Sequence, residues 1–345
     1  MAITFSKEKK KIQSICEFPV DFYICTSILS RYLMSLLKKY LTRAFTAIGL
    51  ILLLNAEVMP QSTKSAEDSL SVSEIVEEDS ADVTYQRFNK MPVWHEMFTN
   101  VPGDWSKYFT ATFRENKIPL YLAVSALTAA TIVTDDKSWQ ITRKNHDASI
   151  FATKFDEFWT EFGDGRTQFG LAAAFGLYGL ISDDARAMRT ASQIVQTVIA
   201  SGAVVQVLKH VTGRQTPNTA TTPTGNWVFF PNQIEYAKHV STYDAFPSGH
   251  VTTTLATVIV IAENYPEVWW IRPVGYTVTA LVAYGMVGTG IHWYSDYPLA
   301  VALGYTFGMI AAHPEGIPDV IAGKKISVMP MLVDRGFGVS IGIKF

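Results

Sequence analysis

The sequence predicts an all-α fold, a bundle of about six core helices followed by a short C-terminal β-hairpin. The chain has 345 residues and is 48% hydrophobic, which suits one large domain or two small ones. Most of its apolar segments are too long for strands and lack strict alternation, so helices are expected. These segments are residues 118–134, 168–182, 192–208, 250–263, 270–291 and 297–312.

Two further stretches complete the expected fold. Residues 138–165 have the pattern of an amphipathic helix that ends at glycine, and we predict a single helix there. Near the C-terminus, residues 326–333 and 337–345 flank the turn-forming Asp-Arg-Gly, and the second run alternates apolar with small or polar residues. This alternation predicts a β-hairpin, and residues 315–345 are assigned to it as a tail.

The N-terminal region has the layout of a targeting segment. A basic stretch precedes the apolar run 44–54, which leads into small and polar residues, as in a secretory signal peptide. We assign the signal peptide to residues 34–61, and expect Met34 to be the start of the protein and residues 1–33 to be an upstream extension. An uncleaved membrane anchor is the alternative. Residues 62–91, rich in Ser, Glu, Asp and Lys, predict a flexible linker before a folded domain at 92–314, with its core at 116–314.

The charge and cysteine content argue against nucleic-acid binding and against cysteine metal sites. The formal net charge is -2 and the basic residues are scattered, so no nucleic-acid partner is expected. Both cysteines, Cys16 and Cys25, precede Met34. The remainder of the chain therefore has neither a disulfide nor a cysteine metal site.

Three polar stretches lie at the ends of the predicted core helices. Lys209 and Arg214 follow the third apolar segment, Pro-Ser-Gly and His250 precede the fourth, and His292 and Asp296 separate the fifth from the sixth. In an antiparallel bundle these three places fall on one face. The sequence therefore predicts that two histidines, one carboxylate and two cations converge.

Each of these residues has an ordinary structural explanation when it is taken alone. His292 and Asp296 are four residues apart, so on a helical turn they share a face, and the carboxylate would fix the tautomer of the ring. At the start of the fourth helix, free N–H groups of Ser248, Gly249 and His250 would point at an anion. Together on one face, these residues predict an active site.

Phosphoryl transfer is the chemistry that fits this set. A phosphate ester carries concentrated negative charge, so it needs cations and N–H donors that are held in advance. It also needs a nucleophile and an acid for the leaving oxygen. Because no acidic metal cluster is evident, we expect the imidazole itself to be the nucleophile, with no metal.

The arrangement resembles the type 2 phosphatidic acid phosphatase (PAP2) family, which includes bacterial class A acid phosphatases and vanadium haloperoxidases. Its three motifs are Lys, six residues and Arg-Pro; Pro-Ser-Gly-His; and Ser-Arg, five residues, His, three residues and Asp. The resemblance covers roughly residues 116–314, the second motif is complete, and order and spacing match.

The resemblance implies a PAP2-type helical bundle in which His292 attacks phosphorus and forms a phosphohistidine. Asp296 would orient His292, and His250 would protonate the leaving group. The oxygens of the phosphate would be held by Lys209, Ser248 and Gly249.

Two motif arginines are absent. Thr216 stands before Pro217 where the first motif has arginine, and Met286 stands where the third motif has it. Losing such charge-assisted contacts weakens phosphate binding unless other groups replace them. Arg214 is the expected substitute; the other candidates, among which the sequence does not choose, are Lys238, His239, Arg143 and Lys144.

We therefore expect an envelope phosphatase that acts on a phosphate monoester or a lipid (pyro)phosphate, with no cofactor. One alternative is a degenerate PAP2-like protein that binds an anionic or lipid ligand without catalysis. A lesser alternative is a haloperoxidase, which would hold vanadate.

The expected location follows from segment lengths and topology. Several apolar segments are shorter than the roughly 20 residues of a membrane span. An N-terminal signal followed by six full spans would also put the site in the cytoplasm, the side opposite to the one on which this family acts. We therefore expect an exported domain in the periplasm or cell envelope, associated with a membrane or free of it. An integral inner-membrane protein is the alternative.

Overall fold

The computed structural model describes residues 88, 90–113, 117–316, 325–333 and 336–344. The expected upstream extension, the signal peptide, nearly all of the linker and both cysteines lie outside these residues. The folded body that carries the predicted site falls within them.

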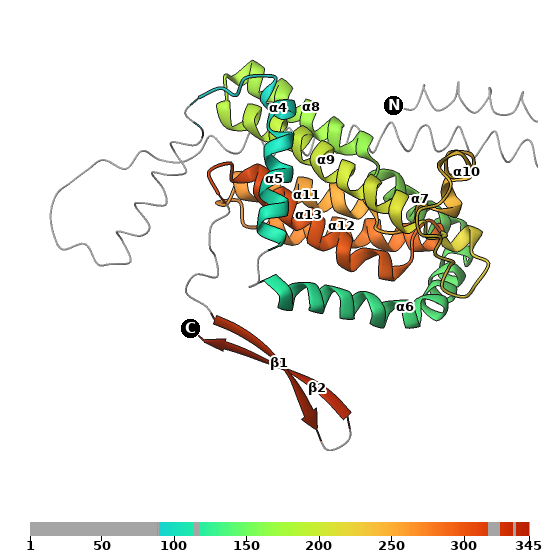
Figure 1. The fold of residues 1–345 in the computed structure, drawn as a ribbon. Coiled ribbons are helices and arrows are strands. Elements are labelled where there is room, and N and C mark those ends of the chain that lie inside the picture. Colours follow the sequence, from blue (N-terminus) through green and yellow to red (C-terminus); the bar gives the residue numbers. More distant parts are fainter. Residues whose placement is uncertain (1–87, 89, 114–116, 317–324, 334–335, 345) are drawn as a thin grey trace, which may run out of the picture. The chain divides into compact units, whose positions relative to one another are not determined.

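The helical prediction is confirmed, and each apolar segment forms a helix (Figure 1). The six corresponding helices are α6 (Ile118–Asp147), α8 (Gly165–Ser182), α9 (Ala185–Thr212), α11 (Gly249–Asn264), α12 (Ile271–Gly288) and α13 (Tyr297–Ala312). Shorter α-helices are α4 (Glu96–Thr99), α5 (Val101–Thr112), α7 (Ile150–Phe162) and α10 (Gln233–Lys238). Three 3-10 turns are η3 (Pro217–Thr219), η4 (Val240–Thr242) and η5 (Tyr294–Asp296).

Helix α11 lies at the centre of the bundle and packs against α8, α9, α12 and α13. Along α11, Ala256, Ile259 and Val260 are fully buried. Helix α13 approaches α11 closely, because a Cβ atom on Gly308 would lie 2.7 Å from Cβ of Ile259. The absence of a side chain at this position therefore sets the spacing between the two central helices.

The prediction of a single helix over residues 138–165 is wrong. Helix α6 continues to Asp147, and the chain then turns before α7. Ser149 adopts an extended backbone and its side chain accepts a hydrogen bond from the N–H of Ala152, which starts a new helix. This serine N-cap, rather than any loss of amphipathic pattern, divides the stretch into two helices.

The backbone of the C-terminal segment forms the predicted hairpin. Strands β1 (Lys325–Val333) and β2 (Gly336–Lys344) pair antiparallel, from Lys325 opposite Lys344 to Val333 opposite Gly336 (Figure 1).

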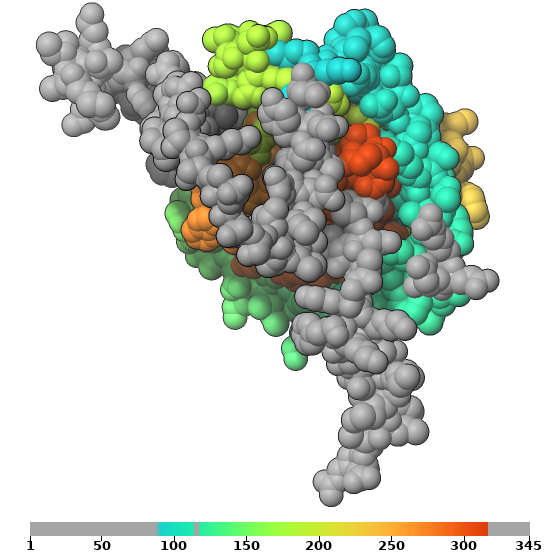
Figure 2. All heavy atoms as spheres, turned by 90° about the vertical axis from the view of Figure 1, so that its left-hand side faces the viewer, coloured from blue at the N-terminus to red at the C-terminus, as the bar shows by residue number. Residues whose placement is uncertain are grey.

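Two described helices, α6 and α9, are long and apolar enough to cross a membrane by length and composition. They differ in environment, because half of the apolar window of α9 is buried in the bundle but only 6% of that of α6. On α6, Leu122, Leu127 and Val133 are exposed. Figure 2 shows α5 and α6, in cyan and teal, along one side of the helical body beside the red end of α13. Helix α6 thus carries an apolar surface that its neighbours do not cover.

We predict that Gly308→Ala lowers the free energy of unfolding by about 1–3 kcal/mol, because the new methyl group would overlap Ile259 on α11. Gly170→Ala on α8 is the matched control, since a Cβ there meets nothing within 4 Å. It should be neutral or should stabilise by up to about 1 kcal/mol. Denaturant unfolding of both variants checks this, and equal effects at the two positions would contradict the packing described.

Candidate active site

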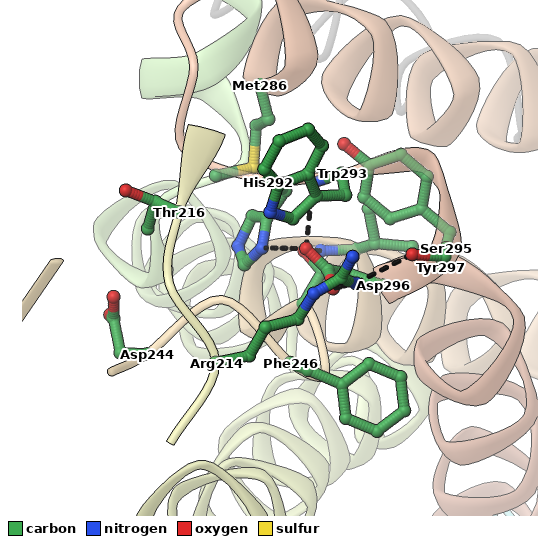
Figure 3. Close-up of polar contacts among 12 residues, drawn as sticks. Arg214, Thr216, Asp244, Phe246, Met286, His292, Trp293, Ser295, Asp296 and Tyr297 are labelled. Carbon is green, nitrogen blue, oxygen red and sulfur yellow. Dashed lines mark hydrogen bonds and ion pairs between the residues drawn. The ribbon is translucent and has the colours of Figure 1, made fainter. Parts of the chain in front are cut away.

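The predicted convergence of polar residues is present at one end of the bundle. Lys209 lies in the last turn of α9, His250 in the first turn of α11, and His292 and Asp296 between α12 and α13. The ring centroids of His250 and His292 are 6.4 Å apart. Figure 3 shows His292, Asp296 and Arg214 gathered together, with Thr216 and Asp244 to one side. Helix ends far apart in sequence therefore supply one cluster.

His292 and Asp296 meet, although not on a helical turn. Helix α12 ends at Gly288, Gly290 has a φ of 76°, and Trp293 is extended before η5 begins. Nδ1 of His292 lies 3.3 Å from Oδ2 of Asp296, and the same oxygen accepts the N–H of Trp293 at 2.8 Å. The pairing that was expected from helical spacing is made by a loop that folds back on itself.

The carboxylate fixes the tautomer of His292. Because an ionised carboxylate only accepts hydrogen bonds, Nδ1 of His292 carries a proton, and in the neutral ring the lone pair is then on Nε2. Nε2 is buried, and it has no hydrogen-bond partner among the residues that the structure describes. A buried nitrogen with an unused lone pair is suited to attack an electrophile.

Arg214 lies behind Asp296 rather than in front of the histidines. Its Nη1 donates to Oδ1 of Asp296 at 2.5 Å and to Oγ of Ser295 at 2.6 Å. Its Nη2 donates to Oδ2 of Asp135 and to the carbonyl of Thr224, both at 2.8 Å. Both terminal nitrogens are occupied and the side chain is fully buried. Arg214, the expected substitute for a motif arginine, thus has both terminal nitrogens bound to protein groups.

Asp135 on α6 is a component of the site that sequence reasoning missed. It is fully buried, accepts the N–H of Ser295 at 3.1 Å and the Ser295 hydroxyl, and forms an ion pair with Arg214. Burial raises the pKa of Asp135, and the hydrogen bonds from Ser295 and Arg214 counteract that rise. The available signal was a pair of acidic residues, Asp135-Asp136, within an apolar helix.

His250 lies in surroundings that disfavour its charged form. Burial, followed by the nearby His292 and Lys209, lowers the pKa of His250 from 6.5 to about 4. The turn between α7 and α8 lies against it, because a Cβ atom on Gly163 would come within 3.3 Å of Cβ of His250. His250 is therefore neutral at pH 7 in the protein as described.

The Pro-Ser-Gly-His stretch offers fewer donors than expected. The Ser248 side chain caps α11 by accepting the N–H of Val251 at 3.4 Å. The N–H of Ser248 donates to the carbonyl of Asp296 at 3.2 Å, so it is already used. In the described part of the chain, the N–H groups of Gly249 and His250 have no acceptor. These two groups, rather than all three, remain available to an anion.

A pocket opens beside the position of the missing first-motif arginine. It has a volume of about 780 Å³, and its lining includes Thr216, Asp244, Gly290 and Ile291. Of the four other candidate cations, Lys238 and His239 line this pocket. Arg143 instead pairs with Asp147 on α6 at 3.0 Å, and Lys144 is not among the lining residues. Met286, at the place of the second missing arginine, is fully buried.

Lys209 already has a partner in this pocket. Its Nζ lies 3.4 Å from Oδ2 of Asp244, with 8% of the lysine side chain and 25% of the aspartate side chain exposed.

Within the described residues, no group of three or more His, Cys, Asp and Glu side chains could hold a metal ion.

The shifted pKa of His250 predicts a pH-dependent stability. Between pH 6.5 and about 4 the unfolded chain binds a proton at His250 that the folded protein does not. The parent should therefore lose stability relative to His250→Asn as the pH falls through this window, by up to a few kcal/mol. Unfolding midpoints of both proteins between pH 4 and 7.5 measure the effect. A difference that does not change with pH would contradict it.

The comparisons with known proteins point to one family. Residues 190–314 match the PAP2 superfamily. No curated protein matches the chain. Among solved structures, a transmembrane PAP2-type phosphatidylglycerolphosphate phosphatase from Bacillus subtilis is similar, with 13% sequence identity and a TM-score of 0.38. The likeness covers 64% of this chain and 96% of that one. All three motif regions, from Lys209 to Asp296, fall inside residues 190–314, the part of the chain that matches the PAP2 superfamily.

Proposed function

We propose that the protein is an envelope phosphatase that hydrolyses a phosphate monoester or a lipid (pyro)phosphate through a phosphohistidine at His292. One observation carries the proposal: Nε2 of His292 is buried and has no partner among the described residues, while Nδ1 faces Asp296. Members of the PAP2 superfamily are generally phosphatases, and the matched region contains both histidines and the aspartate.

In the first step, Lys209 and the N–H groups of Gly249 and His250 hold the phosphoryl oxygens. The Nε2 lone pair of His292 attacks phosphorus, and the bond between phosphorus and the leaving oxygen breaks. That oxygen takes a proton from His250. The ring of His292 becomes positively charged while it carries the phosphoryl group, and Asp296 stabilises this charge.

In the second step, water attacks the phosphohistidine and the P–N bond breaks. His250, which lost its proton in the first step, now accepts one from the attacking water. His292 returns to its neutral form with the proton on Nδ1, and phosphate leaves. Both histidines are thereby regenerated without a metal or an external base.

The low pKa of His250 is compatible with a role as an acid. In the free protein, burial and the charges nearby keep the ring neutral. A bound phosphate dianion would place negative charge beside the ring, and such a charge raises the pKa of a histidine. Substrate binding would therefore bring the acid into its protonated form.

Membrane association fits the exposed face of α6. Only 6% of the apolar window of this helix is buried, although Asp135, near the middle of the helix, reaches the site. Contact between this face and lipid would bury apolar surface. We propose that the enzyme works at a membrane surface of the envelope, where a lipid phosphate would reach the site.

A second candidate is a degenerate PAP2-like protein that binds an anionic ligand without catalysis. Thr216 and Met286, at the places of the two motif arginines, favour it because both are buried and neither carries charge. Trapping the phosphoryl intermediate separates the two functions.

His292→Ala should abolish the release of inorganic phosphate from p-nitrophenyl phosphate and from dioleoyl phosphatidic acid in vesicles, because Nε2 of His292 forms the bond to phosphorus in the proposed mechanism. The parent, incubated with ³²P-labelled phosphatidic acid and quenched with base, should carry an acid-labile label that the variant lacks. His95→Ala is the matched control, since this exposed histidine at the start of α4 lies outside both the pocket lining and the proposed chemistry. A variant at His292 that is as active as the parent would refute the mechanism.

A further inference from the structure

Each cation of the site already faces a carboxylate. Arg214 lies between Asp296 and Asp135, and Lys209 lies 3.4 Å from Asp244. The two additional arginines that the family motifs would supply are absent. A phosphate dianion that enters this site thus finds no uncompensated cation among Lys209 and Arg214, although phosphoryl binding depends on such charges.

The carboxylate of Asp244 is positioned to meet the substrate as well as Lys209. Asp244 lines the pocket of about 780 Å³, whose wall reaches Gly290 and Ile291, directly before His292. Figure 3 shows Asp244 on the same side of the site as Thr216. A substrate with its phosphorus at His292 can therefore place its leaving group in this pocket, next to Asp244.

The backbone holds Asp244 in place. The N–H of Ala245 donates to the carbonyl of Arg214 at 3.0 Å, which ties the Asp244 segment to the strand-like stretch that carries the buried arginine. With 25% of its side chain exposed, Asp244 is open to a ligand but only partly screened by water.

We propose that Asp244 determines substrate specificity by binding a cationic amine in the leaving group of the phosphate ester. The ammonium group would pair with Asp244, and the phosphate would then take Lys209 as its own partner. The substrate class is therefore a zwitterionic phosphate ester with the amine a few bonds from the phosphate. This inference rests on the proposed phosphatase function.

The two basic residues that line the pocket do not oppose this assignment. Lys238 and His239 have side chains that are 60% and 61% exposed, and both lie near Glu235, at 3.1 and 3.5 Å. Exposed pairs of this kind are screened by water and contribute little. Asp244 is the more deeply placed charge of the pocket.

The test compares 2-aminoethyl phosphate with ethyl phosphate, which share the reacting group and differ by the amine. We expect kcat/KM of the parent to favour the amine by about tenfold, the effect of one charge-assisted hydrogen bond. Asp244→Asn should lose this preference, and Asp244→Glu should retain part of it. Glu235→Gln, which removes a neighbouring carboxylate from outside the pocket lining, should leave the preference unchanged.

The outcomes separate the two levels of the proposal. If the parent releases no phosphate from either ester, nor from p-nitrophenyl phosphate or phosphatidic acid, the phosphatase function fails, and the specificity fails with it. If it hydrolyses p-nitrophenyl phosphate or phosphatidic acid but neither of these two esters, only the specificity is overturned. If it hydrolyses both without preferring the amine, only the specificity is overturned. A preference that persists in Asp244→Asn, while His292→Ala is inactive, also overturns the role of Asp244 and leaves the phosphatase function intact.

Discussion

A buried guanidinium between two carboxylates organises the site. Arg214 binds Asp296 at 2.5 Å and Asp135 at 2.8 Å, and all three side chains are fully buried. Charges out of water are tolerated only when they are paired, and removal of one partner typically costs about 3–5 kcal/mol. The loop after α9, the turn η5 and helix α6 must therefore assemble together. Asp296 is held from behind by this cluster, which leaves its other oxygen to orient His292.

The residues proposed to form and break bonds match the family motifs, whereas two of the positions that would bind phosphate do not. In the proposed mechanism, His292 is the nucleophile, Asp296 orients it, and His250 is the acid. The surrounding charges do not follow the family motifs, because Thr216 and Met286 are neutral and Lys209 faces Asp244. The charges around a site determine which substrate is bound in the transition state. A change in these charges is therefore expected to alter the substrate preference more than the type of reaction. The substrate specificity is thus expected to differ from that of a site in which two motif arginines bind the phosphate.

The sequence was informative where a feature depends on local pattern. Apolar segments predicted the core helices, and their antiparallel order predicted that Lys209, His250 and His292 meet at one end. It was uninformative about the role of Arg214, because that role depends on Asp135, which lies 79 residues away and has no motif around it. The division between α6 and α7 depends on one capping serine within a continuous amphipathic pattern. The occupied N–H of Ser248 depends on a carbonyl of another loop, which no spacing rule predicts.

The tautomer of His292 tests the central claim most directly. In protein labelled with ¹⁵N at histidine, with His292→Gln used to assign the signals, NMR at neutral pH distinguishes a protonated from an unprotonated ring nitrogen. The account predicts the proton on Nδ1, in the hydrogen bond to Asp296, and a bare Nε2 that faces the site. A proton on Nε2 in the free protein would leave no lone pair to attack phosphorus and would contradict the account.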